Sequence, residues 1–320
     1  MDIKSNGKST ANKISDVRIA YICLCHFDPW FIAKAADALR YKNDGFFVHV
    51  DKRTDVSEFI EECADLDNVH FVSDEQRVCS CWGGFNAVIA AVRTMQLALS
   101  SGDYDRFMFL QGQDYPLVSN KRIHGFFTEH QGEEFCRAKN LTESNSEEKK
   151  NITGYWIYDI EKKNPFKSAA AHYLHSASYK GIINRKPYFE SKSGRWDIYK
   201  GWAQLAITRE CAEYLVNAFE TDHRFNRYMK HRFPADELYF QTLIYNSEFR
   251  NRLSDYRVYN FYGKPIDMNL TYFKFQPEVL VYRDSADYQK LKSTNCLFAR
   301  KLNSESKELI AAIDAEIREE

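Results

Sequence analysis

Glu237 is the residue best placed for proton transfer, because it stands before an apolar stretch of helical character. The segment 232–247 reads RFPADELYFQTLIYNS, and we expect Pro234 in the first turn of a helix, with Asp236 and Glu237 at its positive end. On such a helix Glu237 shares a face with residues of the next turns and looks toward packed surface. A carboxylate held that way is a candidate general base. The alternative, favoured by this stretch alone, is that both acids only cap the helix.

Asp51 and Arg53 directly follow an apolar run at 45–50 that we interpret as a strand. Open α/β sheets bind ligands at the carboxyl ends of their strands. An aspartate there can accept hydrogen bonds from ribose hydroxyls or a uracil N–H, and Arg53 can reach a phosphate or base carbonyls. A loop-capping aspartate with solvated basic neighbours explains the same residues equally well.

Ser80, Trp82 and the paired Gly83 and Gly84 precede an expected helix at 85–99. Paired glycines let the backbone approach a ligand closely, and the indole offers a flat wall. A core tryptophan beside a tight turn would give the same letters. We favour the binding interpretation.

Asp114 follows the apolar run 106–111 and is separated from Gly112 by one residue. Many nucleotide-sugar transferases place an Asp-x-Asp pair at such a strand end to hold a divalent metal, and here one carboxylate is missing. Two D-x-D tripeptides, 65–67 and 103–105, lie before strands, at the end away from a ligand crevice, and are interpreted as turns. We therefore expect no metal site.

Arg300 and Lys301 form an adjacent cation pair after an apolar run near the end of the chain. Such a pair can neutralise a leaving diphosphate in place of a metal, although two surface cations would look the same. The sequence has no G-x-G-x-x-G after its first strand, no P-loop and no G-x-S-x-G. A dinucleotide oxidoreductase, a P-loop enzyme and an α/β-hydrolase are thereby disfavoured.

The elements that must position these residues follow an alternating strand and helix pattern, which indicates a parallel sheet. Strands are expected at 18–25, 45–50, 68–72 and 106–111, and helices at 29–41, 56–63 and 85–99. In the second half we expect a loop at 140–151, a strand at 154–160, a helix at 168–179, a strand and helix within 202–219, and a final amphipathic helix at 304–319. Thr208 is the expected N-cap of the helix within 202–219.

Composition limits the partners of this chain. Its 320 residues carry 44 Lys and Arg against 45 Asp and Glu, so neither nucleic acid nor an anionic membrane is expected as the main partner. The first apolar run, 18–25, is interpreted as a strand rather than a signal peptide or membrane anchor. Eight cysteines without a C-x-x-C pair disfavour zinc and favour reduced thiols. We expect a cytoplasmic protein, peripheral at most to the inner membrane.

Six motifs in order resemble the core-2/I-branching family of glycosyltransferases, which includes β-1,6-N-acetylglucosaminyltransferases and peptide O-xylosyltransferases. They are HVDKRTD (49–55), CWGGFNAVIAAV (81–92), FLQGQDYPL (109–117), LAITRECAEYLV (205–216), FPADELYFQTLIYNS (233–247) and LFARKL (297–302). The resemblance runs from about residue 17 to about residue 302 and is closest to soluble, bacterial-type members. It implies a GT-A-like α/β fold with a mixed central sheet, and metal-independent transfer from a UDP-sugar with inversion to a β-linkage.

The resemblance also implies roles for single residues. Glu237 matches the family's catalytic base, and Arg300 and Lys301 match the cations that hold the donor diphosphate. The donor-site positions, most similar to the xylosyltransferase branch, are matched by Asp51, Arg53, Ser80 and Trp82, and the acid after the fourth strand by Asp114. Where many members read G-S-[QD]-W-[WF], this chain has GWAQL at 201–205, so a polar acceptor contact is missing.

The expected organisation is one compact domain built in segments. Residues 1–16 form a flexible leader, 17–139 the UDP-sugar half, 140–302 the acceptor and catalytic half, and 303–320 a docking helix. N-acetylglucosamine is the first choice of sugar, xylose the second, and the acceptor a surface polysaccharide or lipid-linked glycan. The alternative from another class is a carbohydrate-binding protein that keeps the fold without catalysis.

Overall fold

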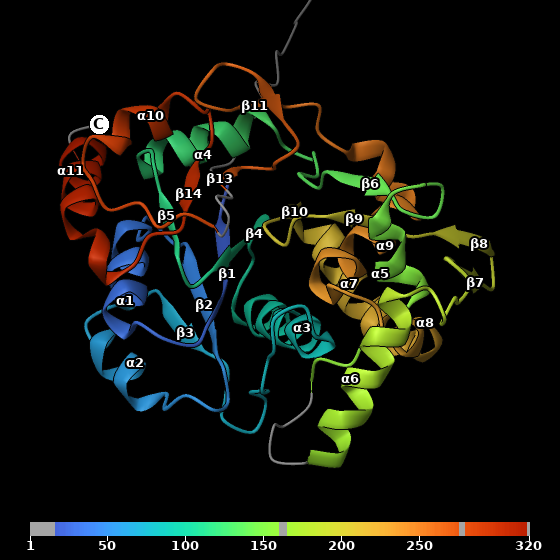
Figure 1. Cartoon of the computed structure of the whole chain (residues 1–320). Helices are drawn as coiled ribbons and strands as arrows, with labels where there is room; N and C mark the ends of the chain where they lie inside the picture. The colour runs from blue at the N-terminus through green and yellow to red at the C-terminus, as the bar shows by residue number, and fades with distance from the viewer. Residues whose placement is uncertain (1–16, 160–164, 275–278, 319–320) are drawn as a thin grey trace, which may run out of the picture.

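A five-stranded mixed sheet forms the centre of the molecule, in the strand order β10-β4-β1-β2-β3 (Figure 1). The computed structural model describes residues 17–159, 165–274 and 279–318, so the predicted leader at 1–16 lies outside the described residues. The sheet consists of β1 (Ile19–Cys25), β2 (Gly45–Val50), β3 (Val69–Phe71), β4 (Arg106–Gln111) and β10 (Ala206–Thr208). The first four strands are parallel, and β10 pairs antiparallel with β4.

Alternate side chains of β1 enter two separate hydrophobic cores, one on each face of the sheet. Ile19 and Tyr21 belong to the core that includes residues of α1 (Pro29–Ala38) and α11 (Lys307–Ile317). Ala20 belongs to the core formed with α3 (Phe85–Ser101), α7 (Arg209–Thr221) and α9 (Tyr239–Tyr245). Because both faces are covered, the strands are continuous apolar runs. This is why they are recognisable in the sequence.

The first half agrees closely with the sequence prediction. Each predicted strand and helix is present, with ends shifted by no more than three residues. The helix predicted at 56–63 is α2 (Ser57–Glu62). After β4 the chain forms β5 (Asp114–Pro116), α4 (Asn120–Glu129) and β6 (Ala138–Asn140).

The middle of the chain corrects two predictions. The predicted loop at 140–151 contains a 3-10 helix, η1 (Glu147–Lys149), and the start of α5 (Lys150–Thr153), where Ile152 is buried. The predicted strand at 154–160 is irregular as far as Asp159, and its last residue lies outside the described part. Trp156 donates its indole N–H to Lys150 O instead of joining a sheet.

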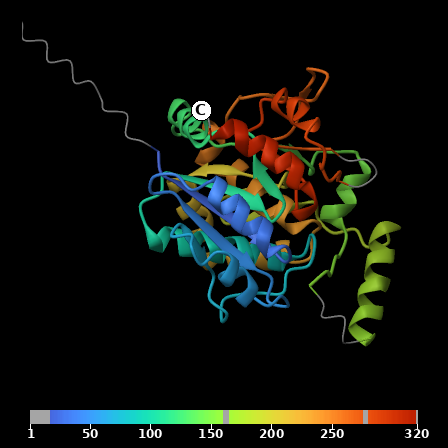
Figure 2. The same cartoon turned by 90° about the vertical axis from the view of Figure 1, so that its left-hand side faces the viewer.

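The remaining elements belong mostly to the second half of the chain. They are α6 (Pro165–Tyr179), β7 (Tyr188–Ser191), β8 (Gly194–Asp197), β9 (Tyr199–Gly201), α8 (His223–Met229), η2 (Ala235–Glu237), η3 (Glu248–Arg252), β11 (Val258–Tyr259), β12 (Pro265–Ile266), β13 (Thr271–Phe273), α10 (Asp287–Lys292), β14 (Phe298–Arg300) and η4 (Ser304–Ser306). The predicted cap of α7 is confirmed, because Thr208 Oγ1 accepts from the N–H of Cys211. Figure 2 shows α6 standing out from the body and α11 lying along it.

A close backbone approach between β6 and β9 depends on Gly201. A Cβ at this position would lie 2.1 Å from the carbonyl oxygen of Arg137, a distance that backbone atoms cannot accommodate without moving. We expect Gly201→Ala to lower the free energy of unfolding by about 1–3 kcal/mol, as overpacking does. Urea unfolding followed by circular dichroism measures this change.

Gly125→Ala is the matched control, because nothing lies within 4 Å of a Cβ at this position in α4. Alanine favours a helix over glycine by up to about 1 kcal/mol, so the control stabilises slightly. Equal effects of the two substitutions would contradict the close approach at Gly201.

Candidate active site

The carboxyl edge of the central sheet gathers most of the residues predicted to contact a nucleotide. His26 follows β1 directly, and partial burial lowers the pKa of its imidazole. The positive charges of Arg53, Arg300 and Lys301 lower the pKa of His26 further, whereas Asp51 opposes them. Four side chains from two distant parts of the chain are therefore within electrostatic reach of one histidine. Sequence reasoning missed His26, although its place after the first strand was a signal.

Asp51 holds two loops together at this edge. Its Oδ1 accepts from the backbone N–H of Arg53 at 2.9 Å and from Arg53 Nε at 2.8 Å. Its Oδ2 accepts from Arg53 Nη2 at 2.8 Å and from the N–H of Ser80 at 2.7 Å. Burial alone would raise the pKa of Asp51, but these donors outweigh it and the pKa is lowered. The aspartate thus fixes Arg53 and the chain at Ser80, and its direct contact with a ligand stays a prediction.

Trp82 and Arg53 line a pocket of about 960 Å³ beside these loops. The Trp82 side chain is 77% exposed, so it is not a core tryptophan. Its ring meets Phe233 edge-on, with centroids 4.9 Å apart. Tyr158, and His175 on α6, line the same pocket. An exposed indole beside a fixed guanidinium suits a planar, hydrogen-bonding ligand such as a nucleobase.

Asp114 positions Arg300 at the end of β14. The two residues are paired across β5 and β14, and Arg300 Nη1 lies 2.9 Å from Asp114 Oδ1. Burial raises the pKa of Asp114, and the positive charge of Arg300 opposes this rise. Lys301 follows with its backbone N–H bound to Leu280 O. The acid after the fourth strand therefore serves as the partner of a predicted phosphate-binding cation.

The D-x-D tripeptides lie where the sequence placed them, before β3 and before β4. Asp105 is bonded to the chain just before β1, because its Oδ2 accepts from the N–H of Arg18 at 2.8 Å. Within residues 17–159, 165–274 and 279–318, no three His, Cys, Asp or Glu side chains come together as a metal site.

Glu237 is the last residue of η2, and α9 begins only at Tyr239. The predicted single helix from Pro234 is therefore wrong: Pro234 has an extended backbone, with φ −77° and ψ 134°, and precedes the 3-10 turn. The N–H of Ala235 donates to Gly83 O at 2.9 Å, which ties this turn to the glycine loop. Tertiary contact, rather than helix continuity, sets the position of Glu237.

The environment of Glu237 raises its pKa to about 7. Burial is the largest cause, and the negative charge of Asp236 adds to it. Lys200 opposes the rise, with its Nζ 3.6 Å from Glu237 Oε2 and 3.0 Å from Glu148 Oε1. Glu237, Lys200 and Glu148 all line a pocket of about 400 Å³. A base works best when its pKa lies near the working pH, so this geometry suits proton transfer better than capping.

A match to a family model shows to which protein family this chain belongs. The model described as "Branch: Core-2/I-Branching enzyme" matches residues 19–273. The chain belongs to this family. Its mixed α/β architecture is accordingly the predicted GT-A-like fold of a glycosyltransferase.

Individual relatives of this core-2/I-branching member match over shorter stretches. Xylosyltransferase 2 of Bos taurus and of Homo sapiens are each 28% identical over 127 residues, which cover 38% of this chain and 14% of theirs. Xylosyltransferase 1 of Rattus norvegicus is 24% identical over 127 residues, 15% of its length. Among solved structures, the apo WbbM bifunctional glycosyltransferase matches with a TM-score of 0.39 and 13% identity, covering 96% of this chain and 52% of that one.

Two further features concern the cysteines and the helices of the protein. All eight cysteines lie in the described ranges and are free thiols. In the part of the chain that the structure describes, every helix is too short or too polar to cross a membrane.

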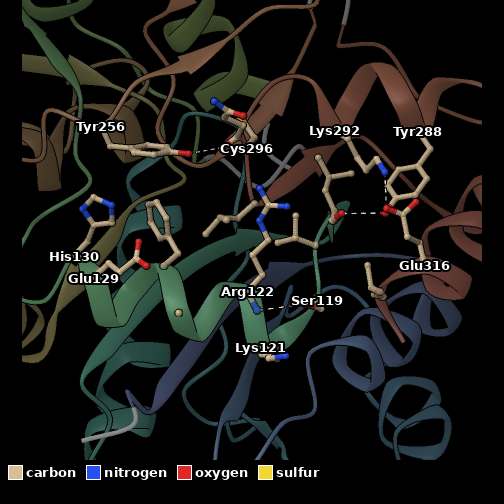
Figure 3. Close-up of a pocket in the computed structure, with 17 residues that line it drawn as sticks. Ser119, Lys121, Arg122, Glu129, His130, Tyr256, Tyr288, Lys292, Cys296 and Glu316 are labelled. Carbon is tan, nitrogen blue, oxygen red and sulfur yellow. Dashed lines mark hydrogen bonds and ion pairs between the residues drawn. The ribbon is translucent and has the colours of Figure 1, made fainter. Parts of the chain in front are cut away.

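A third pocket, of about 800 Å³, is drawn in Figure 3. It is lined from α4, α10 and α11 and by Leu297, which precedes β14, whereas Arg300 ends that strand. Lys292 forms an ion pair with Glu316, and Tyr288 donates to a backbone carbonyl. None of the predicted site residues lines this pocket.

The raised pKa of Glu237 predicts a pH-dependent effect of Glu237→Gln on stability. Folding shifts the pKa from 4.5 to about 7, so the ionised carboxylate destabilises the folded state above pH 7 and has no effect below pH 4.5. Glutamine removes this penalty. We expect the variant to gain up to about 3 kcal/mol in free energy of unfolding at about pH 8, and nothing at about pH 4.

Urea unfolding of the wild type and the variant at both pH values measures the difference. Glu58→Gln, on the exposed surface of α2, is the control and should show no such dependence. A gain of the same size at both pH values would contradict the assigned environment of Glu237.

Proposed function

We propose that the protein is an inverting, metal-independent glycosyltransferase that moves a sugar from a UDP-sugar to a hydroxyl of a glycan acceptor, forming a β-linkage. Membership of the core-2/I-branching family supports sugar transfer. The observation that carries the mechanism is Glu237, a carboxylate with a pKa of about 7 on the wall of a pocket.

The proposed reaction is a single displacement. Glu237 accepts the proton of the acceptor hydroxyl while the oxygen of that hydroxyl bonds to the anomeric carbon of the donor. The bond from that carbon to the diphosphate oxygen breaks, and the electron pair leaves with UDP. Arg300 and Lys301 stabilise the charge that develops on the diphosphate, which is the task a metal performs in other transferases.

The charge of a proposed phosphate-binding cation, Arg300, influences the turn that carries the proposed base. Asp236 adjoins Glu237, and its pKa is raised to about 6, chiefly by burial. The positive charge of Arg300 lowers the pKa of Asp236 and so reaches the turn that carries the base. In this proposal the donor bridges the space between Arg300 and Glu237.

The pocket beside Trp82 and Arg53 is the proposed site of the uracil and ribose. N-acetylglucosamine is the first choice of sugar from the family at large. The similarity to xylosyltransferases supports UDP-xylose as the alternative donor. The proposed acceptor is a growing surface polysaccharide or a lipid-linked glycan, and the proposed place is the cytoplasm, peripheral to the inner membrane.

Glu237→Gln tests the base directly. A panel of UDP-sugars, UDP-N-acetylglucosamine and UDP-xylose among them, is offered with a metal chelator, and UDP release is measured with and without glycan acceptors. We expect the variant to lose about 10²–10⁴ in turnover, the usual contribution of a general base, and to keep the thermal shift given by UDP. The control Glu58→Gln should keep both. Unchanged turnover in Glu237→Gln would overturn the assignment.

A double substitution of Arg300 and Lys301 by alanine tests the diphosphate site. Each phosphate contact from a cation contributes about 1.5–3 kcal/mol, so we expect UDP affinity to fall at least tenfold while uridine binding changes little. The control replaces Arg283 and Lys290, two exposed cations, in the same way. Calorimetric titration of UDP measures the affinities. Intact UDP affinity in the site variant would contradict the role of both cations.

The same measurements separate the binding-protein alternative. A carbohydrate-binding protein of this fold would bind glycan without UDP release from any donor. Binding of a UDP-sugar with release that depends on Glu237 would exclude it.

A further inference from the structure

The pocket beside Glu237 has an aromatic wall that the proposed reaction leaves unused. Besides Glu237 it is lined by Trp202 and Tyr245, with Lys139, Lys200 and Asp267 among its polar residues. Its volume of about 400 Å³ is that of a compact ligand site.

The Trp202 side chain is held in place on several sides. Its indole N–H donates to the carbonyl oxygen of Asp267. Its ring meets Phe273 edge-on, with centroids 4.7 Å apart and planes at 87°. A side chain fixed by packing and a hydrogen bond forms a preorganised surface and loses little entropy when a ligand arrives.

The backbone of Trp202 is fixed relative to the proposed base. Gln241 Nε2, in the first turn of α9, donates to Trp202 O at 2.8 Å. Glu237 lies four residues before Gln241 and next to the start of the same helix. The tie therefore sets the separation between the aromatic wall and the carboxylate.

The lining of the pocket includes both donors and acceptors of hydrogen bonds. Lys200 and Lys139 bring ammonium groups, both paired with Glu148. Arg137 adds a guanidinium, and Asp267 and Glu237 add carboxylates, so the three cations and three acids of the lining balance. A neutral ligand with many hydroxyl groups fits this balance better than an anion does, because hydroxyls both donate and accept.

These features match the surface of a pyranose ring. Such a ring presents C–H groups on a face, which pack on an aromatic wall, and hydroxyls around its edge. We propose that the pocket is the acceptor subsite for one neutral pyranose residue, packed against Trp202 with the hydroxyl to be glycosylated at Glu237. The inference rests on the proposed function and deepens it: the acceptor is a sugar, and not a serine side chain of a peptide.

Kinetics with methyl pyranosides test this acceptor subsite. UDP release from the active UDP-sugar is measured without acceptor, with methyl glycosides of common hexoses and with a serine-containing peptide. We expect methyl pyranosides to stimulate release, and Trp202→Leu to raise their KM about tenfold, the value of one aromatic contact. Donor KM and acceptor-independent release should not change. Trp202→Phe should recover most of the loss.

Trp30→Leu is the matched control, because it removes another half-buried tryptophan, on α1, with the same substitution. It should leave the KM for methyl pyranosides at the wild-type value. An unchanged acceptor KM in Trp202→Leu would overturn the subsite, as would stimulation by the peptide and by no sugar. In both cases donor turnover would persist, and the proposed function would stand.

Saturation-transfer NMR provides a readout that needs no turnover. Methyl pyranosides bound to the wild type should receive saturation at their ring C–H protons, and at sugar concentrations below the wild-type KM the Trp202→Leu variant should lower this transfer about tenfold. Transfer of wild-type size in Trp202→Leu would place the sugar elsewhere and overturn the inference. Sugar binding without turnover of any UDP-sugar would instead count against the proposed transferase alone.

Discussion

The ion pair between Arg300 and Asp114 joins the end of the chain to the central sheet. Asp114 begins β5, Arg300 ends β14, and the register of these antiparallel strands places the two opposite each other. Asp114 Oδ2 also accepts from the N–H of Gln111, the last residue of β4. A shift of the β14 register by one residue would turn Arg300 to the other face and leave a buried carboxylate without its cation, which is strongly unfavourable. The position of Lys301 depends on the same pairing.

At the site near Glu237 the acids outnumber the cation, whereas Asp114 and Arg300 pair one to one. Asp236 and Glu237 are neighbours, burial raises the pKa of both, and Lys200 is shared between Glu237 and Glu148. Such an arrangement opposes folding and persists only because surrounding contacts determine the backbone. The hydrogen bond from Ala235 N–H to Gly83 O is among these contacts. It also joins the turn that carries Glu237 to the loop that carries Trp82, so the two pockets share a support.

The sequence predicted most of the first half because burial on both faces leaves apolar runs between turns. The same prediction from apolar runs failed at 154–160, because the described residues of this apolar stretch do not form a strand. Trp156 and Tyr158 pack on aromatic rings, including Phe233, and a loop can bury rings as well as a strand does. It failed again at 140–151, where polar letters suggested a loop. There η1 and α5 form because Ile152 finds a core site that no local pattern reveals.

Motifs located single site residues, but tertiary contact decides how they act. Nothing in the spacing of Glu148, Lys200 and Glu237 predicts that one ammonium group bridges both carboxylates. The departure at 201–205 likewise reads in the sequence as a lost polar contact. In the fold, Gly201 allows β9 to approach Arg137 O closely, and the next residue thereby reaches the pocket wall. Trp202 therefore adds an aromatic surface to the pocket, a contribution that only the packing of β6 against β9 reveals.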